Sequence, residues 1–315
     1  MRLLALALVL HLGAAFAQPY PTKALKLVTP FPPGGSADVI ARLAADRLSD
    51  GLGQPVVVDN RQGAGGMVGN EYAAKQPPDG YTLLLITGAY PVQAAMLKSL
   101  PFDPLRDIAM ISMLTSYPFV ISVRPDSRFK TLAELIAEAK ANPGKLNYPS
   151  SGIGTVHHLS GELLNAMAGT EMTHVPFRGG ASPLTELLGG RVDLLLEAMT
   201  LSIGQINSGK LRALAVTSRE RWKALPDVPT VNETLPGYEV ISFIGLGATG
   251  GTPAPIIQRV NAEVRKFLAR PETAKRFIEL GGDPRATSPE EMKSFIERDI
   301  TRWKAVVEAR HIERQ

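Results

Sequence analysis

Short apolar runs and longer amphipathic runs alternate along most of this sequence, and few folds accommodate that order. Residues 25–31, 55–59 and 81–87 are apolar enough for buried strands, whereas 36–52 and 67–75 carry apolar side chains at helical spacing. A strand–helix–strand–helix–strand order requires crossover connections, which place the strands parallel in one sheet. The N-terminal third therefore predicts an α/β domain built on a parallel sheet.

A second series of the same kind follows. Capping boxes at Thr131–Glu134 and Ser288–Glu291 predict the starts of two helices. A length of 315 residues accommodates two domains of about 150 residues each. The sequence thus predicts a second α/β domain and a helical tail, with strands at 119–123, 145–148, 173–177, 192–196 and 211–217, and helices at 132–141, from Thr155, from Pro183, at 255–269, at 271–280 and from Pro289.

Composition excludes several classes of protein. Cysteine is absent, which removes disulfide frameworks, Cys-based zinc sites, iron–sulfur clusters and thiol nucleophiles. The net charge of +4 is small for this length, and no basic run marks a nucleic-acid surface. His158 and Glu162 could hold a metal with His174, but a histidine near a helix start more often packs or hydrogen-bonds. We expect no metal, no cofactor and no nucleic-acid partner.

The first residues have the pattern of a secretory signal. Met1-Arg2 supplies a short positive region, residues 3–12 an apolar stretch, and Ala15-Phe16-Ala17 a cleavage site of the A-x-A type. We therefore predict a signal peptide over residues 1–17 and a mature chain that begins at Gln18. Because no cysteine is available for acylation at the cleavage point, the product is expected to be soluble in the periplasm.

Three strand ends run through a Gly-rich turn directly into a helix, at residues 32–36, 147–155 and 175–183. Any one such turn is most simply a tight connection whose Ser or Thr caps the helix. Ligands of parallel α/β sheets, however, bind at the carboxyl ends of the strands, and helix starts attract anions. Three such turns in one chain therefore indicate an anion-binding site.

Other motifs are less specific. Residues 60–69 imitate a dinucleotide fingerprint, but the glycine spacing is one residue off and no acidic residue follows at the ribose position, which favours a Gly-rich wall beside another ligand. Common hydrolase, metalloprotease and phosphate-loop signatures are missing, and Ser127 and Lys130 match S-x-x-K without its companion motifs. Trp222 and Trp303 lie outside the candidate loops, which disfavours a stacked sugar. Donor-rich loops suit a small carboxylate.

Many ordered motifs covering nearly all of the mature chain resemble the Bug family, the extracytoplasmic solute receptors of tripartite tricarboxylate transporters. The resemblance implies a type II periplasmic binding protein, in which two α/β lobes are joined by two crossing strands with the ligand cleft between them. It places residues 18–120 with 241–315 in one lobe and 121–240 in the other. The motifs are LVTPFPPGGSADVIAR, GQPVVVDNRQGAGGMVGN, PPDGYTLLL, NPGKLNYPSSGIGTVHHLSGELL, HVPFRGG, LLGGRVD, GKLRALAVTS, LPDVPTVNE and GTPAPIIQRVNAEV.

The resemblance also implies a set of binding residues and no catalytic ones. Arg178 is either a bidentate carboxylate clamp or a solvated surface arginine. The turn at Gly88-Ala89 and the pair Phe243-Ile244 depart from the common family pattern, where the non-carboxylate part of the ligand is expected to rest. The implied ligand-binding residues are Gly34, Gly35, Ser36, Asp38, Gly65, Gly66, Gly88, Ala89, Ser151, Gly152, Thr155, His158, Arg178, Gly179 and Gly180.

The function that the resemblance implies is capture of a small carboxylate and its delivery to a membrane permease of the tripartite tricarboxylate type. The carboxylate could be a di- or tricarboxylate, an acidic amino acid or an aromatic acid, and the receptor is expected to be a monomer. A carboxylate-sensing module that presents its loaded form to a sensor protein is an alternative. A periplasmic enzyme is a third, supported only by the Ser127 and Lys130 pair.

Overall fold

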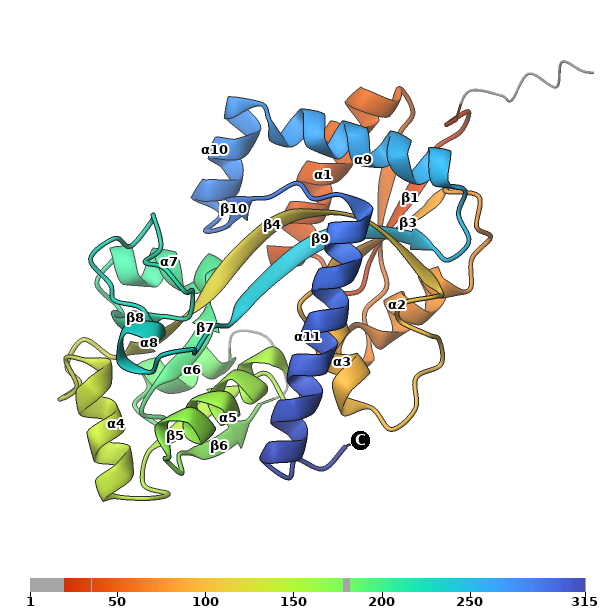
Figure 1. Ribbon diagram of the computed structural model, residues 1–315. Helices are drawn as coiled ribbons and strands as arrows, with labels where there is room; N and C mark the ends of the chain where they lie inside the picture. The colour runs from red at the N-terminus through yellow and green to blue at the C-terminus, as the bar shows by residue number, and fades with distance from the viewer. Residues whose placement is uncertain (1–19, 35, 178–181, 315) are drawn as a thin grey trace, which may run out of the picture.

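The computed structural model describes residues 20–34, 36–177 and 182–314, and it shows two lobes joined by two long strands (Figure 1). The predicted signal peptide lies outside these residues. The connecting strands are β4 (Ile108–Val123) and β9 (Ile241–Thr249), which pair antiparallel from Ile108 opposite Thr249 to Pro118 opposite Ile241. Beyond Pro118, β4 changes partners and pairs with two strands of the other lobe.

Lobe 1 contains the sheet formed by β10, β4, β9, β3, β1 and β2, in that order. The strands β1 (Leu25–Thr29), β2 (Val56–Asn60) and β3 (Thr82–Thr87) are parallel, which confirms the predicted β-α-β-α-β unit. The complete sheet is mixed, because β9 returns from the other lobe and lies antiparallel between β3 and β4. The short β10 (Asp283–Pro284) closes the edge.

Helices cover both faces of this sheet because its strands are apolar on both sides. On β1, Leu25 and Leu27 face one core and Val28 faces the other. The first core contains α1 (Ser36–Leu52) and α9 (Ala254–Leu268), and α10 (Pro271–Glu279) lies beside α9. The second core contains α2 (Met67–Ala74), α3 (Ala89–Met96) and α11 (Pro289–Ala309). The 3-10 turn η1 (Ala64–Gly66) precedes α2.

Lobe 2 is built around the far end of β4. Phe119 opposite Ala198 begins its pairing with β7, and Val120 opposite Val216 its pairing with β8. A separate parallel pair completes the lobe. The elements are β5 (Asn147–Ser150), β6 (Thr173–Pro176), β7 (Leu195–Ala198), β8 (Arg212–Val216), α4 (Leu132–Ala141), α5 (Val156–Ala168), α6 (Ser182–Leu188), α7 (Met199–Asn207) and α8 (Val231–Thr234).

Local signals located most helices, and both predicted capping boxes are present. Two strand predictions need correction, and some helices were missed. The strand predicted at 119–123 is the end of the much longer β4, the strand predicted at 192–196 is β7 at Leu195–Ala198, and α3 and α7 were not predicted. No helix in the three described ranges is long and apolar enough to cross a bilayer.

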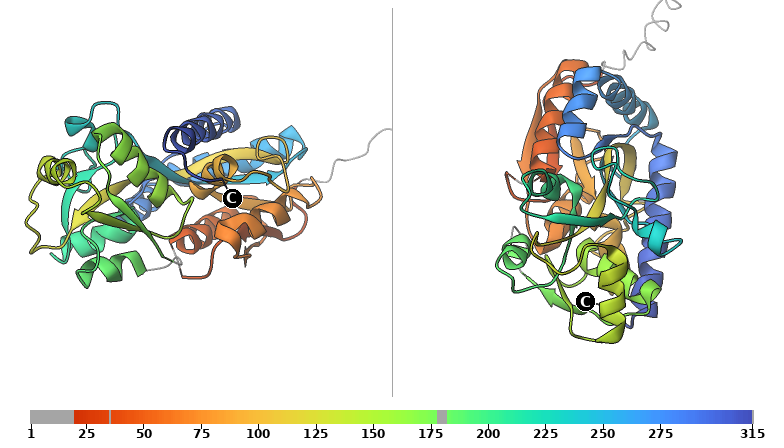
Figure 2. Two further views of the ribbon diagram at one scale, coloured as in Figure 1. Left: turned by 90° about the horizontal axis from the view of Figure 1, so that it is seen from below. Right: turned by 90° about the vertical axis from the view of Figure 1, so that its left-hand side faces the viewer.

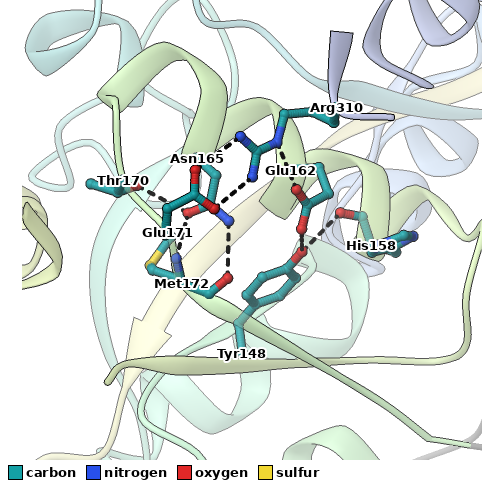
Figure 3. A network of polar contacts seen from close by, with 8 residues as sticks. All are labelled: Tyr148, His158, Glu162, Asn165, Thr170, Glu171, Met172 and Arg310. Atoms are coloured by element: carbon teal, nitrogen blue, oxygen red, sulfur yellow. Dashed lines mark hydrogen bonds and ion pairs between the residues drawn. The ribbon is translucent and has the colours of Figure 1, made fainter. Parts of the chain in front are cut away.

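The last helix, α11, belongs to both lobes, as the two further views show (Figure 2). Met292, Ile296 and Ile300 lie in the second core of lobe 1. Directly after the helix, Arg310 donates through Nε to Glu162 of α5 at 2.9 Å and through both Nη atoms to Glu171, and Tyr148 donates to the same Glu162 at 2.7 Å (Figure 3). The chain end is therefore fastened to lobe 2.

Candidate functional site

The turn between β1 and α1 is shaped by Asp38. Its carboxylate accepts from the backbone N–H of Gly34 at 3.0 Å, from Asn60 Nδ2 at 2.9 Å and from Arg42 Nε at 2.9 Å, and Asp38 is only 3% exposed. Burial acts to raise the pKa of Asp38, but these donors outweigh it and the pKa is lowered. Asp38 is therefore ionised, and it ties the first turn to the end of β2. Gly34 has a φ of +85°, which a glycine adopts without strain.

The two neighbouring turns of lobe 1 are joined to the first. A Cβ on Gly66 would lie 3.5 Å from the ring of Phe31, so the β2–α2 turn packs directly on the β1–α1 turn. Gln93 of α3 donates to the carbonyl of Gly65 at 2.7 Å and accepts from Asn70 at 3.1 Å. The turns at the carboxyl ends of β1, β2 and β3 thus form one wall.

The turn after β3 leans on the connecting strand β9. The backbone N–H of Gly88 donates to the carbonyl of Phe243 at 3.2 Å, and a Cβ at this position would lie 2.4 Å from Ser242 Oγ. Ser242 lies opposite Tyr117 of β4 in the sheet. The predicted contact residue Gly88 therefore contacts β9, with Ala89 directly after it at the start of α3.

The opposing wall on lobe 2 is the turn after β5. Thr155 caps α5, accepting from the N–H of His158, and donates to the carbonyl of Gly152 at 2.8 Å. The N–H of Gly152, whose φ is +132°, donates to Ser150 Oγ at 3.0 Å. A Cβ on Gly154 would lie 3.1 Å from Met96 at the end of α3. The β5–α5 turn of lobe 2 thus contacts the C-terminal end of α3 in lobe 1.

His158 points away from this cleft into lobe 2. His158 is 6% exposed, and its ring stacks on the ring of His174 with centroids 3.9 Å apart. Its Nδ1 accepts a hydrogen bond from the N–H of Gly154 at 3.1 Å. Burial lowers the pKa of both histidines, that of His174 to about 3. His174 binds Ser150 Oγ at 2.6 Å. His158 and His174 are therefore neutral, and their hydrogen bonds to Gly154 and Ser150 hold the β5–α5 turn in place from inside lobe 2.

The neighbouring His157, which the sequence analysis passed over as a site residue, reaches the cleft side. Its Nδ1 lies 3.1 Å from Ser151 Oγ, and its Nε2 lies 2.7 Å from Oε1 of Glu197 at the end of β7. Burial acts to lower the pKa of His157, but Glu197 outweighs it and the pKa is raised. A lone acid at the end of an apolar strand, Leu194-Leu195-Leu196-Glu197, was the signal that could have found this pair.

A cavity of about 200 Å³ adjoins the first turn of lobe 1. The hydroxyl of Thr200 at its edge is buried and has no hydrogen-bond partner in the described part of the chain. The lining is mainly apolar and comes from the start of α1, both connecting strands, the start of α7 and the segment after α10: Gly34, Val39, Ile40, Thr115, Tyr117, Thr200, Leu201, Ile244, Leu280 and Gly282.

The structure places most of the predicted site residues in strand-to-helix turns of the two lobes, and among the described residues Gly34 is the predicted one that lines the cavity. Gly34, Asp38, Gly65, Gly66, Gly88 and Ala89 lie on the lobe 1 wall, Ser36 begins α1 there, and Ser151, Gly152 and Thr155 lie on the lobe 2 wall. Gly35, Arg178, Gly179 and Gly180 lie outside the described residues.

The glycine N–H groups shape these turns. Those of Gly34, Gly66, Gly88 and Gly152 donate within the protein. The first N–H groups of a helix have no backbone partner inside that helix, so the starts of α1 and α5 each present backbone donors.

Comparisons with known proteins agree with this architecture. Protein BugT of Bordetella pertussis is 36% identical over 314 residues, covering 97% of this chain and 96% of its own. A solved Rhodopseudomonas palustris protein with adipate matches with a TM-score of 0.85 and 36% identity, covering 93% of this chain and 99% of its own. MatC from Rhodopseudomonas palustris with bound malate matches at 0.80 and 31% identity, covering 91% and 100%.

These solved relatives share the two-lobed architecture, and the family consists of solute-binding receptors rather than enzymes. The sequence-family model described as tripartite tricarboxylate transporter family receptor matches residues 40–312. This range extends from the first helix of lobe 1 through lobe 2 to the end of the last helix. The two-lobed chain described above therefore belongs to the tripartite tricarboxylate transporter receptor family, to which the Bug proteins are related.

Proposed function

We propose that this protein captures a small carboxylate between its two lobes in the periplasm and delivers it to a membrane permease of the tripartite tricarboxylate type. The observation that carries the proposal is the pair of facing walls, each made of turns at the carboxyl ends of parallel strands. Helix starts on both walls supply N–H donors, and such groups favour an anion. Relatives with adipate and with malate support a carboxylate ligand.

The ligand is expected to have an apolar body beside its carboxylate. The lining of the cavity next to Gly34 includes Val39, Ile40, Ile244 and Leu280. These side chains form no hydrogen bonds, so they cannot compensate the desolvation of a charged group of the ligand placed against them. A linear dicarboxylate with a methylene chain, or an aromatic acid, fits this lining better than a compact tricarboxylate. The ligand is thus expected to be a carboxylate, and the apolar lining of the cavity is expected to favour some carboxylates over others.

Native mass spectrometry of freshly purified protein tests the proposal, because a carboxylate that is carried through purification adds its mass. Calorimetric titration with adipate, malate, benzoate and citrate then ranks the candidates. Failure of all four to bind, with no bound carboxylate in the mass spectrum, would contradict the proposal.

A matched pair of glycine variants locates the site. Gly152→Ala and Gly144→Ala both place a side chain at a positive φ on lobe 2, at +132° and +73°. Only Gly152 lies in the β5–α5 turn at the cleft. We expect Gly152→Ala to weaken binding at least about tenfold, because the strain of a side chain at this φ displaces the turn, and Gly144→Ala to leave binding unchanged. Equal effects would argue against the proposed wall.

A further inference from the structure

Three polar side chains of lobe 2 form a chain that ends at the cleft. Ser151 lies in the β5–α5 turn, His157 in the first turn of α5 and Glu197 at the end of β7. Ser151 Oγ is 3.1 Å from His157 Nδ1, and His157 Nε2 is 2.7 Å from Glu197 Oε1. The His157 ring meets the ring of Phe119 edge to face, with centroids 5.1 Å apart, which fixes the plane of the imidazole.

Glu197 determines which nitrogen of His157 always carries a proton. Glu197 is 7% exposed and also accepts from the N–H of Ala198 at 2.8 Å. Burial acts to raise the pKa of Glu197, but His157 and the Ala198 N–H outweigh it and the pKa is lowered. An ionised carboxylate only accepts hydrogen bonds, so Nε2 of His157 is protonated in both charge states. Only Nδ1 titrates.

The charge state of His157 therefore sets the direction of the Ser151 hydroxyl. When His157 is neutral, its bare Nδ1 accepts the Ser151 proton, and the lone pairs of Oγ are left for the cleft. When His157 is an imidazolium, Nδ1–H donates to Oγ, and the hydroxyl proton is free to donate to another group. Ser151 has no other hydrogen-bond partner among the residues that the structure describes. A carboxylate, which only accepts, can use the second arrangement alone.

We propose that Ser151 is a proton-dependent donor to the bound carboxylate, with His157 and Glu197 as its positioning residues, so that carboxylate binding takes up a proton at Nδ1 of His157. The inference rests on the proposed carboxylate function. Atoms balance simply: one proton moves from solvent to Nδ1, and the Ser151 O–H turns from Nδ1 to the ligand. Affinity and protonation are then linked reciprocally.

The surroundings of His157 define the pH range of this coupling. Glu197 faces it from β7, and Tyr117 of β4 stands behind Glu197, close enough for the two to interact electrostatically. His158, next along α5, turns to His174 instead. Because Glu197 raises the pKa of His157, the coupling extends above the usual histidine range. Above the pKa of His157 in the free protein, affinity should fall up to about tenfold per pH unit, as linkage of one proton requires.

Proton uptake is measured by calorimetric titration with adipate, malate and benzoate in buffers of different ionisation enthalpy, at pH values above the pKa of His157 in the free protein as found by its NMR titration. We expect the wild type to take up close to one proton per bound ligand. His157→Gln should bind without uptake and with affinity that no longer depends on pH. His311→Asn removes an exposed histidine whose φ of +51° suits Asn, and it should behave like the wild type.

A second measurement needs no ligand. Nitrogen-15 NMR of histidine-labelled protein should show Nε2 of His157 protonated throughout and Nδ1 titrating, with a lower pKa in Glu197→Gln. Binding without proton uptake, or a His157 that keeps its proton on Nδ1 when neutral, would overturn this inference and leave the proposed function standing. If none of the probes or citrate binds and native mass spectrometry shows no bound carboxylate, while the NMR titration behaves as expected, the carboxylate function fails, and the coupling fails with it.

Discussion

Replacing Arg310 by methionine keeps most of the side-chain volume and removes the charge that joins the end of α11 to lobe 2. Two of its hydrogen bonds go to Glu171, whose side chain is 66% exposed, and such contacts contribute at most about 1 kcal/mol. The third goes to Glu162, whose side chain is only 12% exposed. Without Arg310, Tyr148 is the hydrogen-bond donor that this carboxylate keeps within the described part of the chain.

Removing one partner of a fully buried ion pair costs about 3–5 kcal/mol. Arg310 is 21% exposed along its side chain, so water reaches the site, and we take roughly half of that cost. Together with the share of Glu171, Arg310→Met should lower the free energy of unfolding by about 2–3 kcal/mol.

Urea unfolding followed by far-UV circular dichroism measures this loss. Arg314→Met, which breaks an ion pair with the exposed Glu308, is the matched control and should cost less than about 0.5 kcal/mol. Adding Glu162→Gln to Arg310→Met should recover about 1 kcal/mol, because the uncompensated charge is removed. If Arg310→Met and Arg314→Met are equally stable, the reasoning about a buried tie between the lobes is refuted.

Three further predictions follow from the cleft. Burial lowers the pKa of His174 to about 3, so below about pH 6.5 the folded state binds fewer protons than the unfolded state. The free energy of unfolding should therefore be unaffected by His174 above about pH 6.5 and should fall by up to about 1.4 kcal/mol per pH unit below it. Urea unfolding of His174→Gln should show a smaller dependence on pH than the wild type. Gly88→Ala should weaken ligand binding about tenfold because its Cβ meets Ser242 Oγ at 2.4 Å, and titration of the Gly88→Ala, Ser242→Ala double variant should show recovery. Saturating ligand should shrink the radius of gyration in small-angle scattering, because β4 is the described strand that pairs in both lobes and the chain returns to lobe 1 at the start of β9, so that closure would occur about these two crossings; an unchanged curve with binding confirmed contradicts closure.

The sequence predicted those parts of the fold that depend on neighbouring residues. Capping boxes and apolar spacing located α4 and α11 closely. The helix α3 was missed because Pro91 suggests a loop, although proline is tolerated in the first turn of a helix. The position of β9 between β3 and β4 was beyond reach, because pairing between distant segments leaves no local periodicity.

The candidate site divides in the same way. Gly-rich turns at strand ends marked both walls, since backbone turns of this kind depend on local sequence. Which of two adjacent histidines faces the cleft depends on how α5 is rotated against β6 and β7, and only the fold places His174 behind His158 and Glu197 beside His157. The lobe boundaries at residues 120 and 241 and the identity of the ligand stay predictions.

The central place of β9 determines the order in which this protein can assemble. Until residues 241–249 are available, β3 and β4 each expose an unpaired row of backbone donors and acceptors, because they do not pair with one another. The sheet of lobe 1 thus remains incomplete while the whole of residues 124–240 is synthesised. Contacts so distant in sequence slow folding, and open strand edges invite aggregation. A chain without β9 therefore leaves these two edges open, and we expect chains truncated before β9 to aggregate rather than to fold lobe 1.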